Sequence, residues 1–344
     1  MREERVLEQL FNKAVIFTDI HFGLNNDTYD DLCCDFIKYM VDKSQDCDTC
    51  LFLGDFFHTR HSLDVKTISK ALLSLDILSK SYKKVYMILG NHDMYFRNRR
   101  DIHSLSIADK YPNITIIDTP TVIGDCYMIP FLVNDENIEY KPAKYVFGHF
   151  EESGFMVNKT VRYKDELNLD RYSTYKHVYS GHFHLRQTVK NFTYVGSVFC
   201  QNFGDAGDED KRGFLKLSND GTEEFFSYEN GPKYKFCKIS QIDRLDIKPN
   251  TYLKIINDCP NMTHNQINEI VDNLSKNTNI FNLSVIPYDN DIVSEENTNQ
   301  IINIENINDS IRKMISEMSI DTNNSNINVD LLLNIYDGLS ESED

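Results

Sequence analysis

The sequence predicts an α/β protein with a mainly parallel sheet in its first third and further strands after it. Apolar runs at residues 14–17, 51–53 and 85–89 alternate with segments 29–41 and 63–78, in which apolar residues have helical spacing. Strands that alternate with helices of this length form βαβ units and hence a parallel sheet. The 344 residues, 41% of them hydrophobic, suffice for one large domain and an appendage.

The apolar segments become shorter beyond residue 112, with turn-forming sequences at 219–221 and 230–232. Short apolar runs between turn residues indicate strands, and we expect these to form a second, more antiparallel sheet. The segments concerned are 114–117, 127–130, 144–147, 177–179, 192–195, 214–217 and 224–228.

Three regions are expected along the chain. Residues 1–232 carry the alternating pattern, and residues 233–290 indicate a small α/β unit with strands near 252–256 and 282–286 and a helix near 264–274. Residues 291–344 are rich in Asn, Asp, Glu and Ser, with amphipathic helix candidates at 307–318 and 329–336. Such helices on an acidic linker favour docking to a partner, and a disordered acidic tail is the alternative.

Charge and hydropathy limit the function classes only in part. The net charge is −17, of which −10 falls on residues 291–344, so overall charge neither supports nor excludes a nucleic-acid partner. No stretch approaches the roughly 20 apolar residues of a membrane span, and the N-terminus lacks a signal-peptide pattern. We therefore expect a cytoplasmic protein (host cytoplasm, if the Asn-rich composition indicates a viral origin). The eight cysteines are scattered, and a lone Cys47-x-x-Cys50 is interpreted as structural.

Five short segments bring oxygen and imidazole groups close together in the sequence. Three of them directly follow the apolar runs at 14–17, 51–53 and 85–89, which places their side chains at the carboxyl edge of a sheet, where α/β proteins position their sites. Six of the ten histidines fall in these segments, whereas His61, His103, His177 and His264 lie elsewhere and have no assigned role. The segments are Asp19-Ile20-His21, Gly54-Asp55-Phe56-Phe57-His58, Gly90-Asn91-His92-Asp93, Gly148-His149 and Gly181-His182-Phe183-His184.

Seven of these side chains are candidate ligands for two divalent metal ions. They offer carboxylate, amide and imidazole groups without cysteine, a set that suits manganese, iron, zinc or magnesium, and Asp55 could bridge the two ions. Paired ions stabilise the attacking and leaving oxygens in phosphoryl chemistry. The candidates are Asp19, His21, Asp55, Asn91, His149, His182 and His184.

The order of these motifs resembles the calcineurin-like metallophosphoesterases. The resemblance implies a four-layer sandwich, with two mixed sheets flanked by helices, and a two-metal hydrolase. It also implies that His92 protonates the leaving oxygen, with Asp93 as a residue that orients His92 or begins the next loop. It assigns Asp19, His21, Asp55 and His184 to one ion, and Asp55, Asn91, His149 and His182 to the other.

A finer resemblance rests on His58 and on the downstream segment 194–214. Where protein phosphatases of this superfamily continue GDxxDRG, this chain has GDFFHTR, which is similar to the SbcD-type nuclease subunits of double-strand-break repair. There a histidine at the His58 position supports nuclease activity. The match looks closest to the phage branch, the recombination endonuclease subunits of T-even-like phages. Val198 departs from the proline that is common in this family.

This resemblance implies a DNA exonuclease and single-strand endonuclease that acts in recombination, repair and replication, with Mn²⁺ as the expected ion. Residues 233–290 would then cap the site and bind DNA. The C-terminal helices would dock to a coiled-coil ATPase of the SbcC type, in a heterotetramer built on a homodimer of this chain. Basic residues near the motifs are candidate DNA contacts, although a solvated basic face is the ordinary alternative: Arg60, Arg97, Arg99, Arg100, Lys159, Arg162 and Lys164.

Two other functions stay open at this stage. A stand-alone phosphatase or phosphodiesterase acting on nucleotides or phosphoproteins would use the same ligands, and the acidic composition mildly favours it. A protein whose main task is to regulate an ATPase would be consistent with the acidic, helical C-terminus.

Overall fold

The computed structural model describes residues 8–288 apart from 25–26, 134–135, 165 and 278. The predicted helices at 307–318 and 329–336 lie outside the described residues. None of the described helices is long and apolar enough to span a bilayer. All eight cysteines are free thiols, including Cys47 and Cys50.

The first sheet contains the predicted parallel strands. Its order is β12-β11-β1-β2-β3-β4, in which β1 to β4 are parallel and β11 and β12 are antiparallel additions at one edge. The strands are β1 (Lys13–Phe17), β2 (Thr49–Phe52), β3 (Lys84–Ile88), β4 (Ile114–Ile117), β11 (Gly213–Ser218) and β12 (Glu223–Ser227).

The second sheet has the order β5-β6-β7-β8-β10-β9, and its four central strands are parallel. Only the edge strands β5 and β9 are antiparallel to their neighbours. The prediction of a more antiparallel second sheet is therefore wrong, and segments 114–117, 214–217 and 224–228 belong to the first sheet. The strands are β5 (Thr121–Ile123), β6 (Cys126–Ile129), β7 (Tyr145–His149), β8 (His177–Gly181), β9 (Gln187–Val189) and β10 (Phe192–Tyr194).

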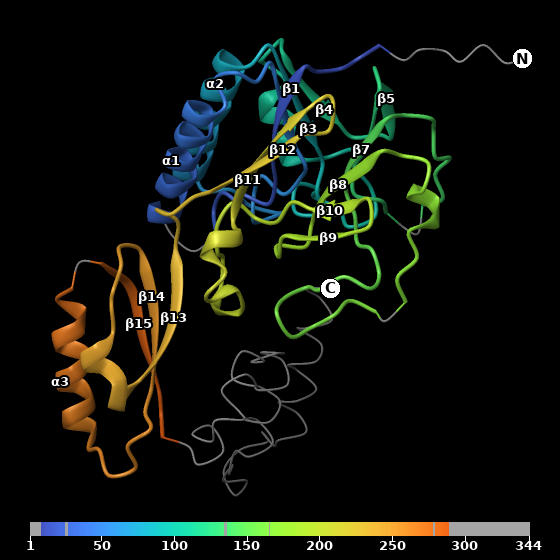
Figure 1. The fold of residues 1–344 in the computed structure, drawn as a ribbon. Coiled ribbons are helices and arrows are strands. Elements are labelled where there is room, and N and C mark those ends of the chain that lie inside the picture. Colours follow the sequence, from blue (N-terminus) through green and yellow to red (C-terminus); the bar gives the residue numbers. More distant parts are fainter. Residues whose placement is uncertain (1–7, 25–26, 134–135, 165, 278, 289–344) are drawn as a thin grey trace, which may run out of the picture.

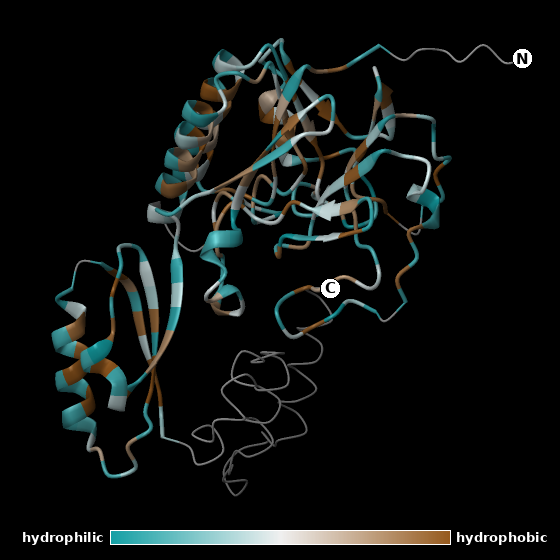
Figure 2. Ribbon diagram, viewed as in Figure 1, coloured by the Kyte–Doolittle hydropathy of each residue, from teal (hydrophilic) through white to brown (hydrophobic). Residues whose placement is uncertain are grey.

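The two sheets pack face to face around a shared apolar core. Alternate residues of β1 show the arrangement, since Ile16 faces the second sheet together with Phe147 of β7, whereas Val15 faces helices α1 (Asp27–Lys43) and α2 (Val65–Ser81). Figure 1 shows these two helices along one side of the first sheet. In Figure 2 both helices carry alternating hydrophilic and hydrophobic bands, as expected for helices with one buried face.

The outer face of the second sheet is covered differently. Apolar side chains from the loops between 131 and 175, such as Phe155 and Tyr172, form its cover, and the regular structure in this part is the short 3-10 helix η2 (Asp170–Tyr172). The α/β sandwich with two mixed sheets is confirmed. In the described part of the chain, however, α-helices flank only the first sheet, and coil forms the fourth layer.

The elements expected between 233 and 288 are present and form a small unit, which lies to one side of the two large sheets (Figure 1). Its strands β13 (Lys233–Lys238), β14 (Thr251–Ile256) and β15 (Ile280–Ile286) are parallel and adjacent in that order. Helix α3 (His264–Ser275) begins with a capping box between Thr263 and Gln266. Short 3-10 helices complete the structure: η1 (Ser104–Ala108), η3 (Phe203–Asp205), η4 (Glu209–Lys211) and η5 (Ile239–Arg244).

Candidate metal centre

The predicted ligands emerge from the carboxyl ends of parallel strands in both sheets. Asp19 follows β1, Asp55 follows β2, Asn91 follows β3, His149 ends β7 and His182 follows β8. Because the two sheets are packed face to face, these strand ends bring side chains from distant parts of the chain together.

The backbone at four of the predicted ligands has a positive φ, which is uncommon for residues other than glycine. The φ values are 52° at Asp19, 52° at His21, 62° at Asp55 and 92° at His182. Hydrogen bonds from Asp19 N to Gly54 O (3.0 Å) and from His21 N to Asp55 O (3.1 Å) stabilise this conformation beyond the ends of β1 and β2. Strain of this kind persists only where the surroundings hold it, and it clusters at functional sites.

One half of the cluster consists of Asp19, His21 and His184. The Nε2 atoms of His184 and His21 lie 3.7 Å and 3.9 Å from Asp19 Oδ1. The same His21 nitrogen lies 3.7 Å from Asp55 Oδ2. One ligand atom from each of Asp19, His21 and His184 lies within 4.8 Å of the other two, so the three could hold one metal ion.

The other half is arranged around the side-chain oxygen of Asn91. Asn91 Oδ1 lies 3.1 Å from His149 Nε2 and 3.0 Å from His182 Nδ1. His149 Nε2 also lies 3.4 Å from Asp55 Oδ2. Asp55 therefore faces both halves, and its other oxygen accepts a hydrogen bond from His92 N at 2.8 Å.

The donor set fits divalent cations. Both ring nitrogens of His21 are buried without a hydrogen-bond partner, an arrangement that is costly unless something binds there. Burial lowers the pKa of His184 to about 4 and that of His21 well below its usual range, so both rings are neutral and their lone pairs are available. Burial raises the pKa of Asp19 to about 7, a shift that a bound cation would oppose.

The neighbouring Asp55 carboxylate favours the protonated, charged form of His149. Burial alone would lower its pKa, but the Asp55 carboxylate outweighs burial and raises the pKa to about 9. Burial of Asp55 would raise its pKa, but the charge of His149 and its hydrogen bond hold that pKa well below its usual range. A cation between these groups would take the place of the His149 proton.

Glycines make room for this packing. A Cβ atom at Gly90 would lie 2.1 Å from Asp55 Oδ1, and one at Gly54 would lie 2.3 Å from His149 Nδ1. Gly54 also has a φ of 101°. Glycine at both positions therefore allows the backbone to approach the carboxylate and the imidazole closely.

Two further groups orient the imidazole ligands. The His149 Nδ1–H donates to Leu53 O at 2.7 Å, which leaves Nε2 facing the cluster. His182 Nε2 lies 3.4 Å from Glu151 Oε1, which leaves Nδ1 facing Asn91. Partners of this kind fix the tautomer and the ring orientation of metal-binding histidines. Sequence reasoning did not single out Glu151 as a site residue, although it follows Gly148-His149 by two positions.

His58 and His92 lie together beside the His21 end of the cluster. Their rings are stacked with centroids 5.5 Å apart, and the His92 ring meets the His21 ring edge-on at 4.9 Å. His92 Nδ1 lies 2.7 Å from the main-chain oxygen of His58. Both side chains are half-buried, so this pair is also accessible from outside.

The Asp93 carboxylate is bound by main-chain groups of two loops. Its buried carboxylate accepts hydrogen bonds from the main-chain N–H groups of Asp55 (2.9 Å), Phe56 (2.9 Å) and Gly90 (3.0 Å). Burial raises its pKa to about 7, assisted by the nearby Asp55 charge. Asp93 thus ties the loop after β2 to the loop after β3, and the oriented ring of His92 depends on the His58 carbonyl instead.

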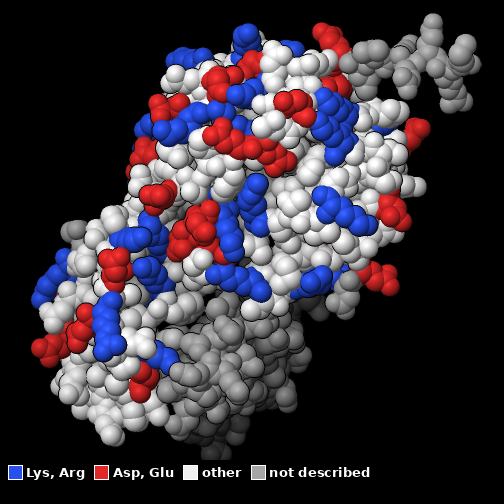
Figure 3. All heavy atoms as spheres, viewed as in Figure 1, with Lys and Arg blue, Asp and Glu red and all other residues white. Residues whose placement is uncertain are grey.

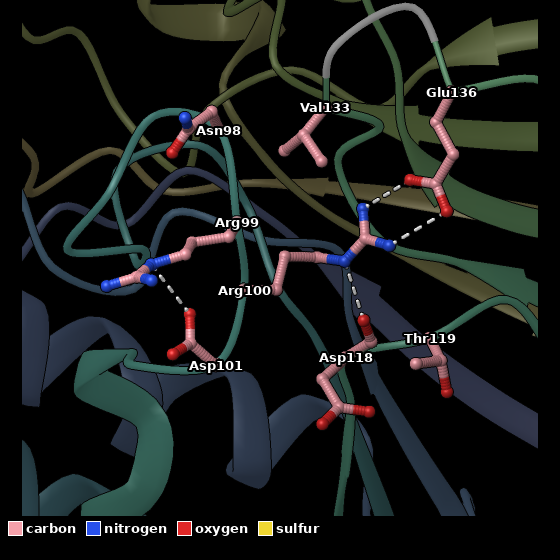
Figure 4. A pocket seen from close by; sticks show the side chains of 8 residues that line it. All are labelled: Asn98, Arg99, Arg100, Asp101, Asp118, Thr119, Val133 and Glu136. Atoms are coloured by element: carbon pink, nitrogen blue, oxygen red, sulfur yellow. Dashed lines mark hydrogen bonds and ion pairs between the residues drawn. The ribbon is translucent and has the colours of Figure 1, made fainter.

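The seven candidate DNA contacts have different surroundings. Arg60 is half-buried with Nη1 unpartnered, and burial, together with the nearby Arg97, lowers its pKa. Arg99 pairs with Asp101 (3.2 Å) and lies over the Phe96 ring. Arg100 forms a bidentate ion pair with Glu136 and donates to Asp118 O (Figure 4). The charge of Arg100 is therefore neutralised by Glu136 within the fold.

The three basic residues after His149 are partly engaged as well. Lys159 donates to Ala206 O at 2.5 Å, Arg162 donates to Gly154 O at 3.1 Å, and Lys164 lies over the Tyr163 ring at 4.6 Å. On the face shown in Figure 3, basic and acidic side chains are interspersed. The described residues on that face therefore carry no large patch of a single sign.

The family model of the calcineurin-like phosphoesterases matches residues 13–186, a range that contains all seven predicted ligands. The chain belongs to this family and is a hydrolase of phosphate esters, as predicted. Members of the family use divalent metals. The resemblance recognised in the motifs is therefore confirmed.

Among characterised proteins, the chain is similar to exonuclease subunit 1 of Enterobacteria phage T4. The two are 28% identical over 234 residues, which cover 64% of this chain and 68% of that protein. The crystal structure of Pseudomonas putida nuclease MPE matches with 21% identity and a TM-score of 0.27. That match covers 50% of this chain, and the chain spans 61% of the nuclease.

Proposed function

We propose that this chain is a metal-dependent DNA nuclease, with exonuclease and single-strand endonuclease activity, and the nuclease subunit of an SbcCD-like complex. The observation that carries the proposal is the convergence of the seven predicted ligand side chains, with Asp55 facing both halves of the cluster and the His58–His92 pair beside it. The T4 relative, named an exonuclease subunit, supports the choice of substrate.

Two ions are assigned to the two halves of the cluster. Asp19, His21 and His184 hold one ion, Asn91, His149 and His182 hold the other, and Asp55 contributes to both. The distances from Asp55 Oδ2 to His21 Nε2 (3.7 Å) and to His149 Nε2 (3.4 Å) support this bridging role. Carboxylate and amide ligands favour Mn²⁺, although Mg²⁺, Fe²⁺ and Zn²⁺ also suit the set.

When bound, a pair of such ions would activate water and would stabilise charge on the oxygens around phosphorus. The side chains supply the proton chemistry. Because the His58 carbonyl can only accept a hydrogen bond, His92 Nδ1 carries a hydrogen, and Nε2 is the atom that exchanges a proton with the leaving oxygen. We assign His92 as this acid, His58 as the residue whose main chain orients it, and Asp93 as the residue that positions Asp55.

Arg60 and Arg97 are the strongest of the proposed DNA contacts. The two cations are near one another, and Arg60 follows His58 by two residues, so together they can bind phosphates next to the site. Arg99, Lys159, Arg162 and Lys164 remain proposed contacts of the outer surface. We leave Arg100 out, because Glu136 neutralises it.

The three regions receive separate parts in this proposal. Residues 1–232 form the nuclease domain and residues 233–290 a capping unit that binds DNA. Residues 291–344, an acidic segment with two helices predicted from the sequence, dock to a coiled-coil ATPase of the SbcC type. Recombination, repair and replication of DNA, in the cytoplasm of a phage host, are the processes that such a complex would serve.

The test is hydrolysis of linear duplex and circular single-stranded DNA by the purified chain, with and without Mn²⁺. The wild type should degrade both, and Asp55→Asn should abolish degradation because the shared ligand loses its charge. Asp76→Asn is the matched control and should remain active, because this carboxylate lies on helix α2 and pairs with Lys80. If the wild type leaves both DNAs intact but hydrolyses nucleoside monophosphates, the chain is a phosphatase and the proposal is wrong.

A further inference from the structure

A buried glutamine outside the five segments that carry the predicted ligands holds the main chain of Asp19. The Gln201 amide Nε2 donates to Asp19 O at 2.7 Å, and the residue is 6% exposed. Asp19 has a φ of 52°, so its carbonyl group points in a direction that the strand ladder does not satisfy. The hydrogen bond from Gln201 both satisfies this oxygen and opposes relaxation of the strained residue.

The same segment holds His184. Arg212, 1% exposed, donates through Nη1 to His184 O and to Ser197 Oγ (2.9 Å). Its Nη2 donates to Asp205 Oδ1 at 2.8 Å, and Asp205 Oδ2 accepts from Gln201 N at 2.9 Å. One buried network therefore joins the main-chain oxygens of Asp19 and His184.

These two residues are ligands of the same proposed ion. The imidazole rings of the other ion's ligands are held by different groups, since the His149 ring bonds to Leu53 O and the His182 ring faces Glu151. The main-chain N–H of His182, and not its ring, donates to the Asp19 carboxylate at 3.1 Å. The network around Gln201 therefore acts on one half of the cluster. This asymmetry distinguishes a positioning role from a general contribution to stability.

The network continues into the small unit. Tyr234 of β13 donates its hydroxyl hydrogen to Gln201 O at 2.6 Å and is 3% exposed. Its ring stacks on that of Tyr252 of β14, with centroids 4.7 Å apart. Cys200, next to Gln201, belongs to the same apolar cluster. The first strand of the small unit thereby fixes the main chain that presents the Gln201 amide.

We infer that Gln201 is a positioning residue for the ion bound by Asp19, His21 and His184, and that Tyr234 links its position to the small unit. The inference rests on the ligand assignment proposed above. Loss of the Gln201 amide lets Asp19 relax from its strained conformation, so its carboxylate is less often in the geometry that binds the cation. The second ion keeps its ligands in place.

The experiment compares full-length wild type, Gln201→Met and Tyr234→Phe, titrated with Mn²⁺ in a calorimeter. Met fills a similar volume without a donor, and Phe removes only the hydroxyl. Gln187→Met is the matched control, because the Gln187 amide also bonds to main chain, at Met156, without contacting a predicted ligand. Electron paramagnetic resonance of the loaded proteins reports the magnetic coupling between neighbouring Mn²⁺ ions.

We expect wild type and Gln187→Met to bind two ions with the same affinities. Gln201→Met should weaken one of the two binding steps by about 10- to 100-fold, the range typical of groups that support metal ligands. The coupled signal should then appear only at higher Mn²⁺ concentration. Tyr234→Phe should weaken the same step by about two- to tenfold, as expected for one hydrogen bond.

The outcomes separate this inference from the ligand assignment. If the wild type binds fewer than two ions, the ligand assignment fails and the inference fails with it. If the wild type binds two ions and Gln201→Met binds both as tightly, only the positioning role is wrong. Equal weakening of both steps would also overturn it. Should Gln201→Met not fold, an unchanged titration of Tyr234→Phe would still contradict the link to the small unit.

Discussion

His92 Nδ1 lies 2.7 Å from the main-chain oxygen of His58, and the two rings are stacked at 5.5 Å. This contact leaves Nε2 of His92 as the nitrogen that can exchange a proton at the site. We expect His92→Gln to lower kcat on DNA by about 10²- to 10⁴-fold, the usual contribution of an acid–base group. Mn²⁺ affinity, measured by calorimetry, should change little because His92 is not a proposed ligand.

The His58 side chain serves as the comparison for that variant. His58→Ala retains the main-chain oxygen that orients His92, so it should lose less activity than His92→Gln. A His58→Ala variant with the greater loss would show that the His58 imidazole, and not its carbonyl group, has the more direct part in the reaction.

Gly90→Ala should weaken metal binding at the shared carboxylate. A Cβ atom there would lie 2.1 Å from Asp55 Oδ1 and 2.4 Å from Asp55 N, so the loop after β2 has to move. We expect Mn²⁺ affinity to fall by at least about tenfold, measured by calorimetry. Gly204→Ala is the control, since its Cβ would meet only the Asn202 side-chain oxygen, at 2.9 Å. Normal affinity in Gly90→Ala would contradict the packing described here.

Asp93→Asn should destabilise the fold without directly removing a catalytic group. The carboxylate accepts hydrogen bonds from the N–H groups of Asp55, Phe56 and Gly90. In the asparagine variant an NH₂ group replaces one of the two oxygens and would face these N–H donors. Loss of a hydrogen bond to a charged group costs about 1.5–3 kcal/mol. The free energy of unfolding in urea, measured with chelator present, checks this value. An unchanged free energy of unfolding would contradict the role of Asp93 in holding these two loops together.

The salt dependence of DNA binding should separate Arg60 and Arg97 from Arg100. Replacement of a residue that contacts phosphate reduces the slope of log affinity against log salt by about 1. We expect this for Arg60→Gln and Arg97→Gln, measured by fluorescence anisotropy with chelator present to prevent cleavage. Arg100→Gln should leave the slope unchanged and lower the unfolding temperature, because it loses Glu136 and Asp118. The reverse pattern would contradict the proposed contacts.

Deletion of residues 295–344 should separate partner docking from catalysis. The acidic segment carries the predicted docking helices and none of the predicted ligands, so the truncated chain should retain nuclease activity on its own. Binding to a coiled-coil ATPase from the same host, measured by co-purification, should be lost. If the truncated chain binds the ATPase as the full chain does, the docking assignment of this segment is wrong.

The sequence alone determined which chemical groups meet and in what order along the chain. Ligand-type side chains directly after apolar runs indicate strand ends, and strand ends of a parallel sheet share one edge. Local spacing was therefore enough to predict that Asp19, Asp55 and Asn91 lie at one edge of the sheet. Local spacing also predicted strands β1 to β3, because short-range periodicity distinguishes strand from helix.

Only the tertiary structure decided which strands pair and which groups support the ligands. The strand segments after residue 112 are short and apolar. Such runs do not reveal whether the neighbouring strand in the sheet is parallel or antiparallel. Gln201 meets Asp19 across 182 positions, and Arg100 meets Glu136 across 36. Contacts over such separations depend on how the chain packs, so no local pattern in the sequence encodes them.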